Sequence, residues 1–171
     1  HRGKTVISWS LNTPFMIRTE EGGAAGLDER LQAAIRCSEW GYPIGFHFDP
    51  LVYYPGWEEQ YRQTVDMLFD AMHGRRIVWI SLGALRCPPG LLEILRERFP
   101  LSSLPLGEFV RGLDGKMRYF RPLRVELFRK LSTWIRDRRP QQTVYLCMEG
   151  ARVWEQVFGF RATPGDVCSL L

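Results

Sequence analysis

In one short stretch of the sequence, a histidine and an aspartate alternate with apolar residues. It is Gly45-Phe46-His47-Phe48-Asp49-Pro50. On an alternating strand, the side chains of His47 and Asp49 share one face, and the apolar side chains share the other. In α/β folds, ligands collect at the carboxyl ends of parallel strands. We therefore expect His47 and Asp49 to touch a ligand. The alternative is that His47 is a hydrogen-bonded core histidine and Asp49 caps the next helix.

Length and composition predict one soluble globular domain, or a large part of one. The 171 residues are 45% hydrophobic and 25% charged, which is ordinary for a domain with its own core. Lys and Arg outnumber Asp and Glu by 23 to 19, and most of the excess is arginine. This balance is compatible with an anionic ligand or nucleic acid and establishes neither, although arginine suits bidentate phosphate contacts.

The cysteines are scattered along the chain, at Cys37, Cys87, Cys147 and Cys168. No pair has CxxC spacing, so the sequence predicts neither a zinc knuckle nor a cluster motif. A disulfide framework is not expected where so many apolar residues can form a core. No apolar run reaches the ~20 residues of a membrane span, and no signal peptide opens the chain. We therefore expect a cytoplasmic protein without a membrane partner.

Strand-like and helix-like segments alternate along the chain. Apolar runs predict strands at residues 5–11, 44–48, 77–82 and 143–149. Apolar stripes predict five helices along the chain. The first is capped by Asp28, the next two follow Gly56 and Gly90, the fourth has Pro122 in its first turn, and the last contains Val153. Residues 108–111 and 116–120 flank a glycine-bearing loop, which predicts a β-hairpin and the only antiparallel pairing.

This order predicts an α/β fold with a parallel sheet and helices on its outside, because crossovers between parallel strands are right-handed. Four parallel strands do not close a barrel, and the first would be an unpaired apolar edge. The chain also starts at His1 without a methionine and enters a strand at Thr5. We therefore interpret residues 1–161 as the carboxyl-terminal half of a partial or full β/α (TIM-like) barrel. The hairpin at about 108–120 is inserted in it, and 162–171 form an irregular tail.

Four motifs in this order resemble the carboxyl-terminal half of the spore photoproduct lyase family. They are Ser8-Trp9-Ser10-Leu11-Asn12, Gly41-Tyr42-Pro43-Ile44-Gly45-Phe46, Gly56-Trp57-Glu58-Glu59-Gln60-Tyr61 and Tyr145-Leu146-Cys147-Met148-Glu149. The resemblance runs from about Thr5 to Gly159. Members of the family are radical S-adenosylmethionine (radical SAM) enzymes, so the resemblance implies a partial β/α barrel of that type.

The resemblance also implies an activity and its cofactors, which are S-adenosylmethionine (AdoMet) and a [4Fe-4S] cluster. In these lyases a deoxyadenosyl radical starts the reversal of the thymine dimer called spore photoproduct, so the implied partner is damaged duplex DNA. The CxxxCxxC cluster signature and the hydrogen-donating cysteine of the family lie upstream of the matched region. No cysteine of this chain matches them, so no catalytic residue and no metal ligand is carried over. The amino-terminal half of the barrel is a further expected partner.

On the cofactor side, the resemblance implies roles for Ser10, His47 and Asp49. Ser10 matches the strand-end serine that meets the cofactor. Asp49 stands where the lyases have a small residue, and its carboxylate could accept from ribose hydroxyls, as acidic residues do in dinucleotide sites. His47 departs from the family pattern as well.

On the substrate side, Arg86 matches a basic residue that faces the lesion, where an arginine could bind the phosphate between the two bases. The alternative for Arg86 is an ion pair with a neighbouring loop. Tyr145 matches an aromatic residue that lines the lesion pocket, and its alternative is a buried core tyrosine.

The hairpin of the lyases carries an Arg-Tyr pair that enters damaged DNA. Alignment places this pair near Val110-Arg111, whereas the chain has Arg118-Tyr119 on the returning strand. Either arginine could contact nucleic acid, with Tyr119 as a stacking ring. A basic face backed by an apolar one is also what any surface hairpin shows.

Two other functions are compatible with the sequence. One is a radical SAM enzyme of the same family that acts on a different substrate, which a polar pocket around His47 and Asp49 would favour. The other is a noncatalytic domain that binds nucleic acid without a cluster.

Overall fold

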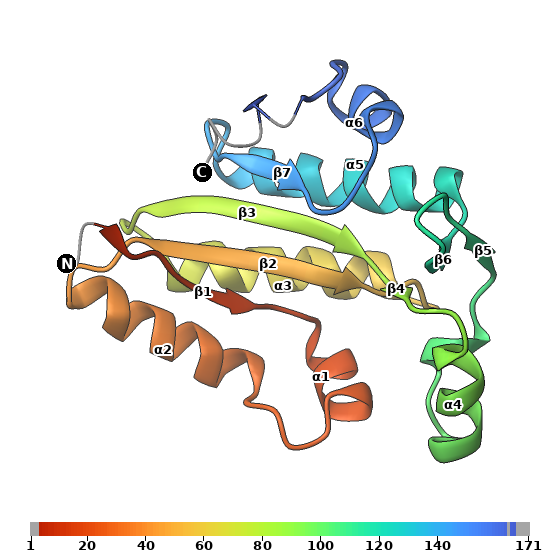
Figure 1. Ribbon diagram of the computed structural model, residues 1–171. Coiled ribbons are helices and arrows are strands. Elements are labelled where there is room, and N and C mark those ends of the chain that lie inside the picture. Colours follow the sequence, from red (N-terminus) through yellow and green to blue (C-terminus); the bar gives the residue numbers. More distant parts are fainter. Residues whose placement is uncertain (1–3, 164, 167–171) are drawn as a thin grey trace.

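The computed structural model describes residues 4–163 and 165–166. Its centre is a sheet of four parallel strands that lie side by side in chain order (Figure 1). These strands are β1 (Ile7–Ser10), β2 (Ile44–Leu51), β3 (Ile77–Ala84) and β7 (Val144–Leu146). The predicted α/β class with a parallel sheet is therefore confirmed. Strand β2 is longer than expected, so Asp49 lies within it and not beyond its end.

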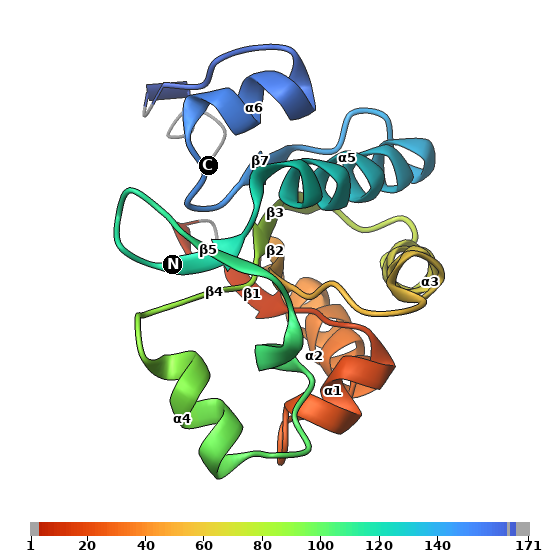
Figure 2. The same ribbon diagram turned by 90° about the vertical axis from the view of Figure 1, so that its right-hand side faces the viewer.

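Three helices cover one face of this sheet: α2 (Leu27–Glu39), α3 (Trp57–Ala71) and α5 (Arg121–Arg138) (Figure 2). Side chains alternate along a strand, so every second residue of β2 points at these helices. Ile44, Phe46 and Phe48 are all 0% exposed as a result. Within the described residues, no helix lies across the opposite face of β1, β2 and β3. We call this second face the open face.

The helix starts agree only in part with the sequence pattern. Helix α2 begins one residue before the expected cap Asp28, and the Gly26 N–H donates to the Glu29 carboxylate at 2.7 Å. Asp28 lies in the first turn of α2, where its charge suits the helix dipole. Helix α1 (Pro14–Glu20) was not predicted, although Thr13 accepts from the Met16 N–H at 3.2 Å as an N-cap.

A second, antiparallel sheet lies beyond the carboxyl ends of β2 and β3. It contains β4 (Arg86–Cys87), β6 (Met117–Tyr119) and β5 (Phe109–Arg111), in that order. The predicted hairpin of β5 and β6 is present. The expectation that it is the only antiparallel pairing is wrong, because β4 also pairs antiparallel with β6. Helix α4 (Leu91–Arg98) and the 3₁₀ helix η2 (Leu104–Leu106) connect β4 to β5.

Helix α6 (Ala151–Phe158) follows β7 and packs on α5. Of the expected irregular tail, Ala162 and Thr163 have no regular structure, whereas Gly165 and Asp166 are helical. Residues 164 and 167–171 lie outside the described residues. No helix of the described chain is long and apolar enough to span a membrane.

The close contact of Trp79 with Gly45 provides a test of the register between β2 and β3. A Cβ atom on Gly45 would lie 2.7 Å from the Trp79 ring, which is too close for any carbon–carbon contact. We expect Gly45→Ala to lower the free energy of unfolding by about 1–3 kcal/mol, as overpacking does. Urea denaturation measures this change. Gly22→Ala is the control, because nothing lies within 4 Å of its Cβ position; equal destabilisation by both substitutions would contradict the packing.

Candidate functional site

A row of polar side chains crosses the open face from one edge of the sheet to the other. Ser10 on β1 is in register with His47 on β2, which is in register with Ser81 on β3. Ser81 is in turn in register with Tyr145 on β7. Because residues in register point to the same face of a parallel sheet, four strands place their polar groups side by side. The structure thus brings together three residues predicted from the sequence, together with Ser81.

His47 is the centre of this row. Its Nδ1 lies 2.6 Å from Ser81 Oγ, and its Nε2 lies 3.1 Å from Ser8 Oγ. A neutral imidazole has one N–H and one bare nitrogen, so one serine hydroxyl accepts from the ring and the other donates to it. The Trp79 ring packs against the imidazole at a centroid distance of 4.7 Å. Burial lowers the pKa of His47 below 6.5, and the charge of Asp49 opposes this effect.

Asp49 lies one step further along β2, where it forms an ion pair with Arg86. The guanidinium donates from Nη1 to Oδ1 at 3.1 Å and from Nη2 to Oδ2 at 3.0 Å. The alternative that Asp49 caps a helix is therefore wrong. Burial disfavours the charge of Arg86, but the bond to Asp49 outweighs burial and raises the pKa of Arg86. The ion-pair alternative for Arg86 is present, although its partner is on a strand and not on a loop.

Cys147, on the segment after β7, joins this pair. Arg86 Nη2 lies 3.7 Å from Cys147 Sγ. Burial raises the pKa of the Cys147 thiol, and its contact with the Asp49 carboxylate raises this pKa further. The group therefore remains a protonated thiol near neutral pH. Gly83 makes room for the cluster, because a Cβ there would lie 2.5 Å from the Asp49 carboxylate.

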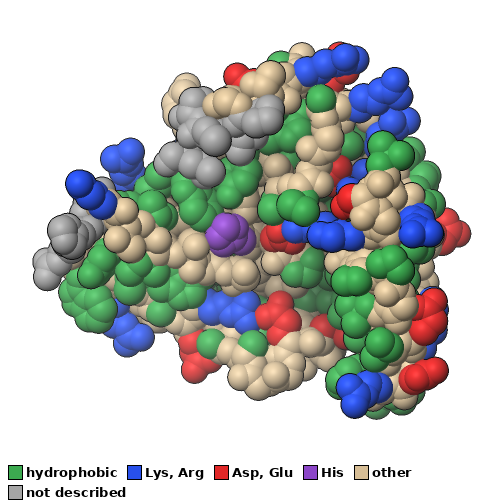
Figure 3. Space-filling model, in the orientation of Figure 1, with side chains coloured by type: hydrophobic (Ala, Val, Ile, Leu, Met, Phe, Trp, Pro, Cys, Tyr) green, Lys and Arg blue, Asp and Glu red, His purple; other side chains and the backbone are tan. Residues whose placement is uncertain are grey.

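Tyr145 and Ser10 complete the row. Tyr145 is half-buried and packs edge-on against Trp79 at 5.9 Å, and burial raises the pKa of its phenol. The alternative of a buried core tyrosine holds only in part, because Tyr145 packs against the hydrophobic core but is partly exposed. Ser10 is exposed, and its hydroxyl makes no hydrogen bond within the part of the chain that the structure describes. It is thus a free hydroxyl beside His47. Figure 3 looks onto the open face and shows a histidine at its surface with basic and acidic side chains beside it.

The predicted hairpin residues point in different directions. Arg111 is exposed. The side chain of Arg118 is 12% exposed, and its Nη2 donates to Asp114 at 2.5 Å. Tyr119 is only 1% exposed, stacks on Phe109 at 5.0 Å, and accepts from the Tyr53 N–H at 3.2 Å. The expected stacking ring for nucleic acid is therefore wrong at Tyr119, because alternation along β6 turns this side chain inward. Burial raises its pKa to about 12.

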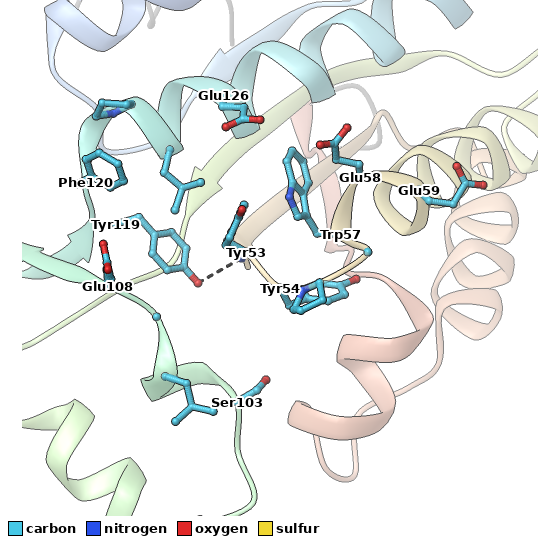
Figure 4. A pocket seen from close by; sticks show the side chains of 16 residues that line it. Tyr53, Tyr54, Trp57, Glu58, Glu59, Ser103, Glu108, Tyr119, Phe120 and Glu126 are labelled. Atoms are coloured by element: carbon cyan, nitrogen blue, oxygen red, sulfur yellow. Dashed lines mark hydrogen bonds between the residues drawn. The ribbon is translucent and has the colours of Figure 1, made fainter.

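A separate cavity of about 990 Å³ lies where Tyr119 reaches the loop before α3 (Figure 4). Its walls are aromatic and acidic, with Trp57 and Glu58 among them. Lys130 already binds Glu58 at 2.5 Å and lies over the Trp57 ring. None of the residues of the polar row lines this cavity, and its carboxylates do not suit an anionic ligand.

Sequence reasoning missed three residues of the site: Ser8, Ser81 and Cys147. The signal for Ser8 and Ser81 was the pairing of strands, since both fall on the open face once the register with β2 is known. Cys147 lies beyond the end of β7, and its contact with Arg86 places it at the site. It also missed Asn12, which is buried where β1 ends. Asn12 accepts from the Tyr61 hydroxyl at 2.8 Å and donates to Glu21 at 3.2 Å. The polar residues that follow β1, Asn12 and Thr13, were the signal in the sequence that could have indicated Asn12.

Comparison with known proteins identifies similar sequences. A family model described as spore photoproduct lyase matches residues 1–144. Spore photoproduct lyase of Bacillus subtilis is 32% identical over 110 residues, which are 63% of this chain and 32% of that protein. The lyase of a Geobacillus species is 29% identical over 113 residues, which are 65% of this chain and 33% of that protein. The matched part is thus about a third of each relative.

Solved structures are similar as well. Spore photoproduct lyase complexed with dinucleoside spore photoproduct superposes with a TM-score of 0.75 at 25% identity. A double mutant of the lyase with bound AdoMet and dinucleoside spore photoproduct gives the same TM-score and identity. Both comparisons cover 85% of this chain and 45% of the solved chain. The chain spans less than half the length of these structures.

The environment of His47 leads to a prediction about its titration. We expect NMR signals of the His47 ring to titrate with a midpoint below 6.5, since burial disfavours the imidazolium. Asp49→Asn should lower the midpoint further, because the carboxylate raises this pKa. As the folded pKa lies below the unfolded one, stability should fall as the pH drops below 6.5. His47→Gln assigns the signal and should flatten that dependence; a midpoint above 6.5 would contradict the burial argument.

Proposed function

This chain belongs to the spore photoproduct lyase family, and we propose that it is the carboxyl-terminal half of a radical SAM enzyme that reverses spore photoproduct damage in DNA. The observation that supports this most directly is the row Ser10, His47, Ser81 and Tyr145 on the open face. A helix-free sheet face with polar groups in register suits the inside of a barrel that holds a ligand. The similarity to solved lyases over most of the chain supports the same assignment.

In this proposal, residues 1–161, of which 1–3 lie outside the described residues, belong to a partial β/α barrel, and the hairpin at about 108–120 is an insertion. Strands β1, β2, β3 and β7 lie in chain order, which is the order expected in a barrel wall. Strand β1 is at one edge of the described sheet. The amino-terminal half of the barrel, as the expected partner, would pair with this edge and close over the open face.

The residues of the open face fit AdoMet by the chemistry of their donors and acceptors. Ser10 offers a free hydroxyl, His47 a neutral imidazole, and Asp49 a carboxylate next to an arginine. Hydroxyls and carboxylates bind ribose, and a carboxylate also binds an ammonium group. When bound next to a reduced iron–sulfur cluster, AdoMet supplies the radical chemistry of such enzymes. The residues of this chain would orient the cofactor and exclude water from it.

The residues do not fit the iron–sulfur cluster itself. Among those described, no group of three or more His, Cys, Asp or Glu side chains is placed to hold a metal ion. The cysteines Cys37, Cys87 and Cys147 are all free. The ligands of the cluster would therefore come from another stretch of chain.

On the substrate side, we propose that Arg86 and Tyr145 face the lesion, with Arg111 and Arg118 nearer to the DNA backbone. The half-buried Tyr145 ring offers a flat surface to a thymine base. Arg86 is held in place by Asp49, so its remaining donor capacity points in a fixed direction. A guanidinium positioned in this way suits the phosphate between two bases.

A related enzyme with another substrate is the alternative that a specific observation favours. Asp49 and His47 make the open face polar, and Asp49 occupies two donors of Arg86. A substrate with several hydroxyl or amino groups would suit this face as well as a thymine dimer does. Binding selectivity separates the two proposals.

The proposed cofactor contact predicts the effect of one substitution. Ser10→Ala should weaken AdoMet binding by about threefold to tenfold, which corresponds to one hydrogen bond. Calorimetric titration of the 171-residue chain with AdoMet measures this change. Ser38→Ala is the matched control, because Ser38 lies on α2, on the other side of the sheet. Equal affinities for the two variants would sink the assignment of Ser10.

The same titration with dinucleoside spore photoproduct tests the substrate. We expect it to bind more tightly than the undamaged dinucleoside, and Tyr145→Ala to remove most of this preference because the stacking surface is lost. Equal affinity of the wild-type chain for both dinucleosides would overturn the spore photoproduct assignment and favour the alternative substrate.

A further inference from the structure

We propose that the cleft between the β5–β6 hairpin and the start of α6 binds phosphate groups of a DNA strand. This cleft has a volume of about 630 Å³ and is lined by five arginines, which are Arg111, Arg118, Arg121, Arg124 and Arg152. Only Asp114 and Glu149 bring negative charge to it. The proposal deepens the proposed function, since DNA as the source of the phosphates rests on it.

Two of the five arginines form the fixed part of the cleft. Arg124 is buried, donates from Nε to Glu149 at 2.8 Å, and also donates to the Tyr119 carbonyl. It therefore ties the base of the hairpin to the turn before α6. Arg118 binds Asp114 at 2.5 Å and so fixes the hairpin loop. These two pairs use both carboxylates of the cleft and hold its walls in place.

The other three arginines are free. Arg111, Arg121 and Arg152 are exposed, and none of their side chains forms a hydrogen bond or ion pair with any residue that the structure describes. They come from three segments, β5, the start of α5 and the start of α6, yet line the same cleft. Because both carboxylates of the cleft are already paired, these three positive charges are not neutralised from within. Three separate guanidinium groups suit successive phosphates of a strand better than one small anion.

The start of α6 adds backbone donors to the same cleft. The first turn of α6 contains no acidic residue, and no side chain caps it. The N–H groups of Ala151 and Arg152 find no acceptor among the described residues. Free N–H groups at a helix start favour an anion, in concert with the helix dipole. Arg152 thus contributes both a guanidinium and a backbone donor.

The position of the cleft fits a strand that also reaches the open face. On β6, Arg118 is in register with Arg86 of β4, whose side chain lies on the open face with Asp49. Figure 3 shows Lys and Arg side chains gathered at the upper right, where the hairpin and α6 lie in Figure 1. A strand held in the cleft would therefore pass next to Arg86.

The proposal is tested by the salt dependence of DNA binding. The probe is a short fluorescein-labelled undamaged duplex, and its affinity for the full chain is measured by anisotropy at several salt concentrations. The double variant Arg121→Gln with Arg152→Gln should bind more weakly, and its slope of log affinity against log salt should be shallower by about 2, or about 1 per lost phosphate contact. The matched control is Arg36→Gln with Arg62→Gln, which removes the same charge from exposed arginines on α2 and α3.

A third variant isolates the backbone donors. Ala151→Pro removes the N–H at the first position of α6, where proline is tolerated. It should lower the affinity by up to about tenfold and leave the salt slope unchanged, because no charge is lost. Circular dichroism confirms that the helix is retained.

Equal salt slopes for the cleft variant and its control would overturn the proposal. The test needs neither AdoMet nor a lesion, so its failure is distinct from failure of the proposed function. If the chain binds dinucleoside spore photoproduct and the cleft variant keeps the wild-type slope, only the cleft is wrong. If the slope falls and the chain binds neither AdoMet nor the lesion, the cleft stands and the lyase assignment fails.

Discussion

The alternation of side chains along β2 is the constraint on which the rest of the structure depends. Ile44, Phe46 and Phe48 fill the core under the helices, and this commits Gly45, His47 and Asp49 to the open face. A shift of one residue in the pairing would exchange the two sets. The large hydrophobic contribution of the three buried side chains thus fixes where the polar groups stand. The parallel register then brings the polar residues of the neighbouring strands to the same level.

Polar side chains on a sheet face need space, and two glycines provide it. Trp79 lies over Gly45, and the Asp49 carboxylate lies over Gly83. Each large group therefore faces a position without a side chain on the next strand. This complementarity allows an ion pair and a histidine–serine network to share one small area without overlap. Buried polar groups in proteins are almost always hydrogen-bonded. The partly buried His47 finds its partners on β1 and β3, and Asp49 finds its partner on β4.

Local patterns were sufficient to predict the class of fold and most of its elements. Strands and long helices have strong periodicity, and the sequence placed His47 and Tyr145 on strands correctly. The partners of these residues were beyond its reach, because Ser81 and Arg86 meet β2 only through pairing of distant segments. Alternation along β6 turns Tyr119 to the face opposite Arg118, but its partners were beyond reach for the same reason. Its packing on Phe109 and its bond to Tyr53 are long-range contacts that a basic hairpin pattern does not indicate.

Strand β4 joins the two parts of the molecule that could meet a ligand. It has only two residues, yet the Arg86 side chain binds Asp49 on the open face while its backbone pairs with β6 of the hairpin. Tyr119 adds a second link, from β6 to the loop before α3. The hairpin is therefore linked to the core at two points, and one of them, β4, also carries the Asp49–Arg86 pair. Arg124 binds both the Tyr119 carbonyl of the hairpin and Glu149 before α6. The same contacts therefore connect the cleft between the hairpin and α6 to the polar row on the open face.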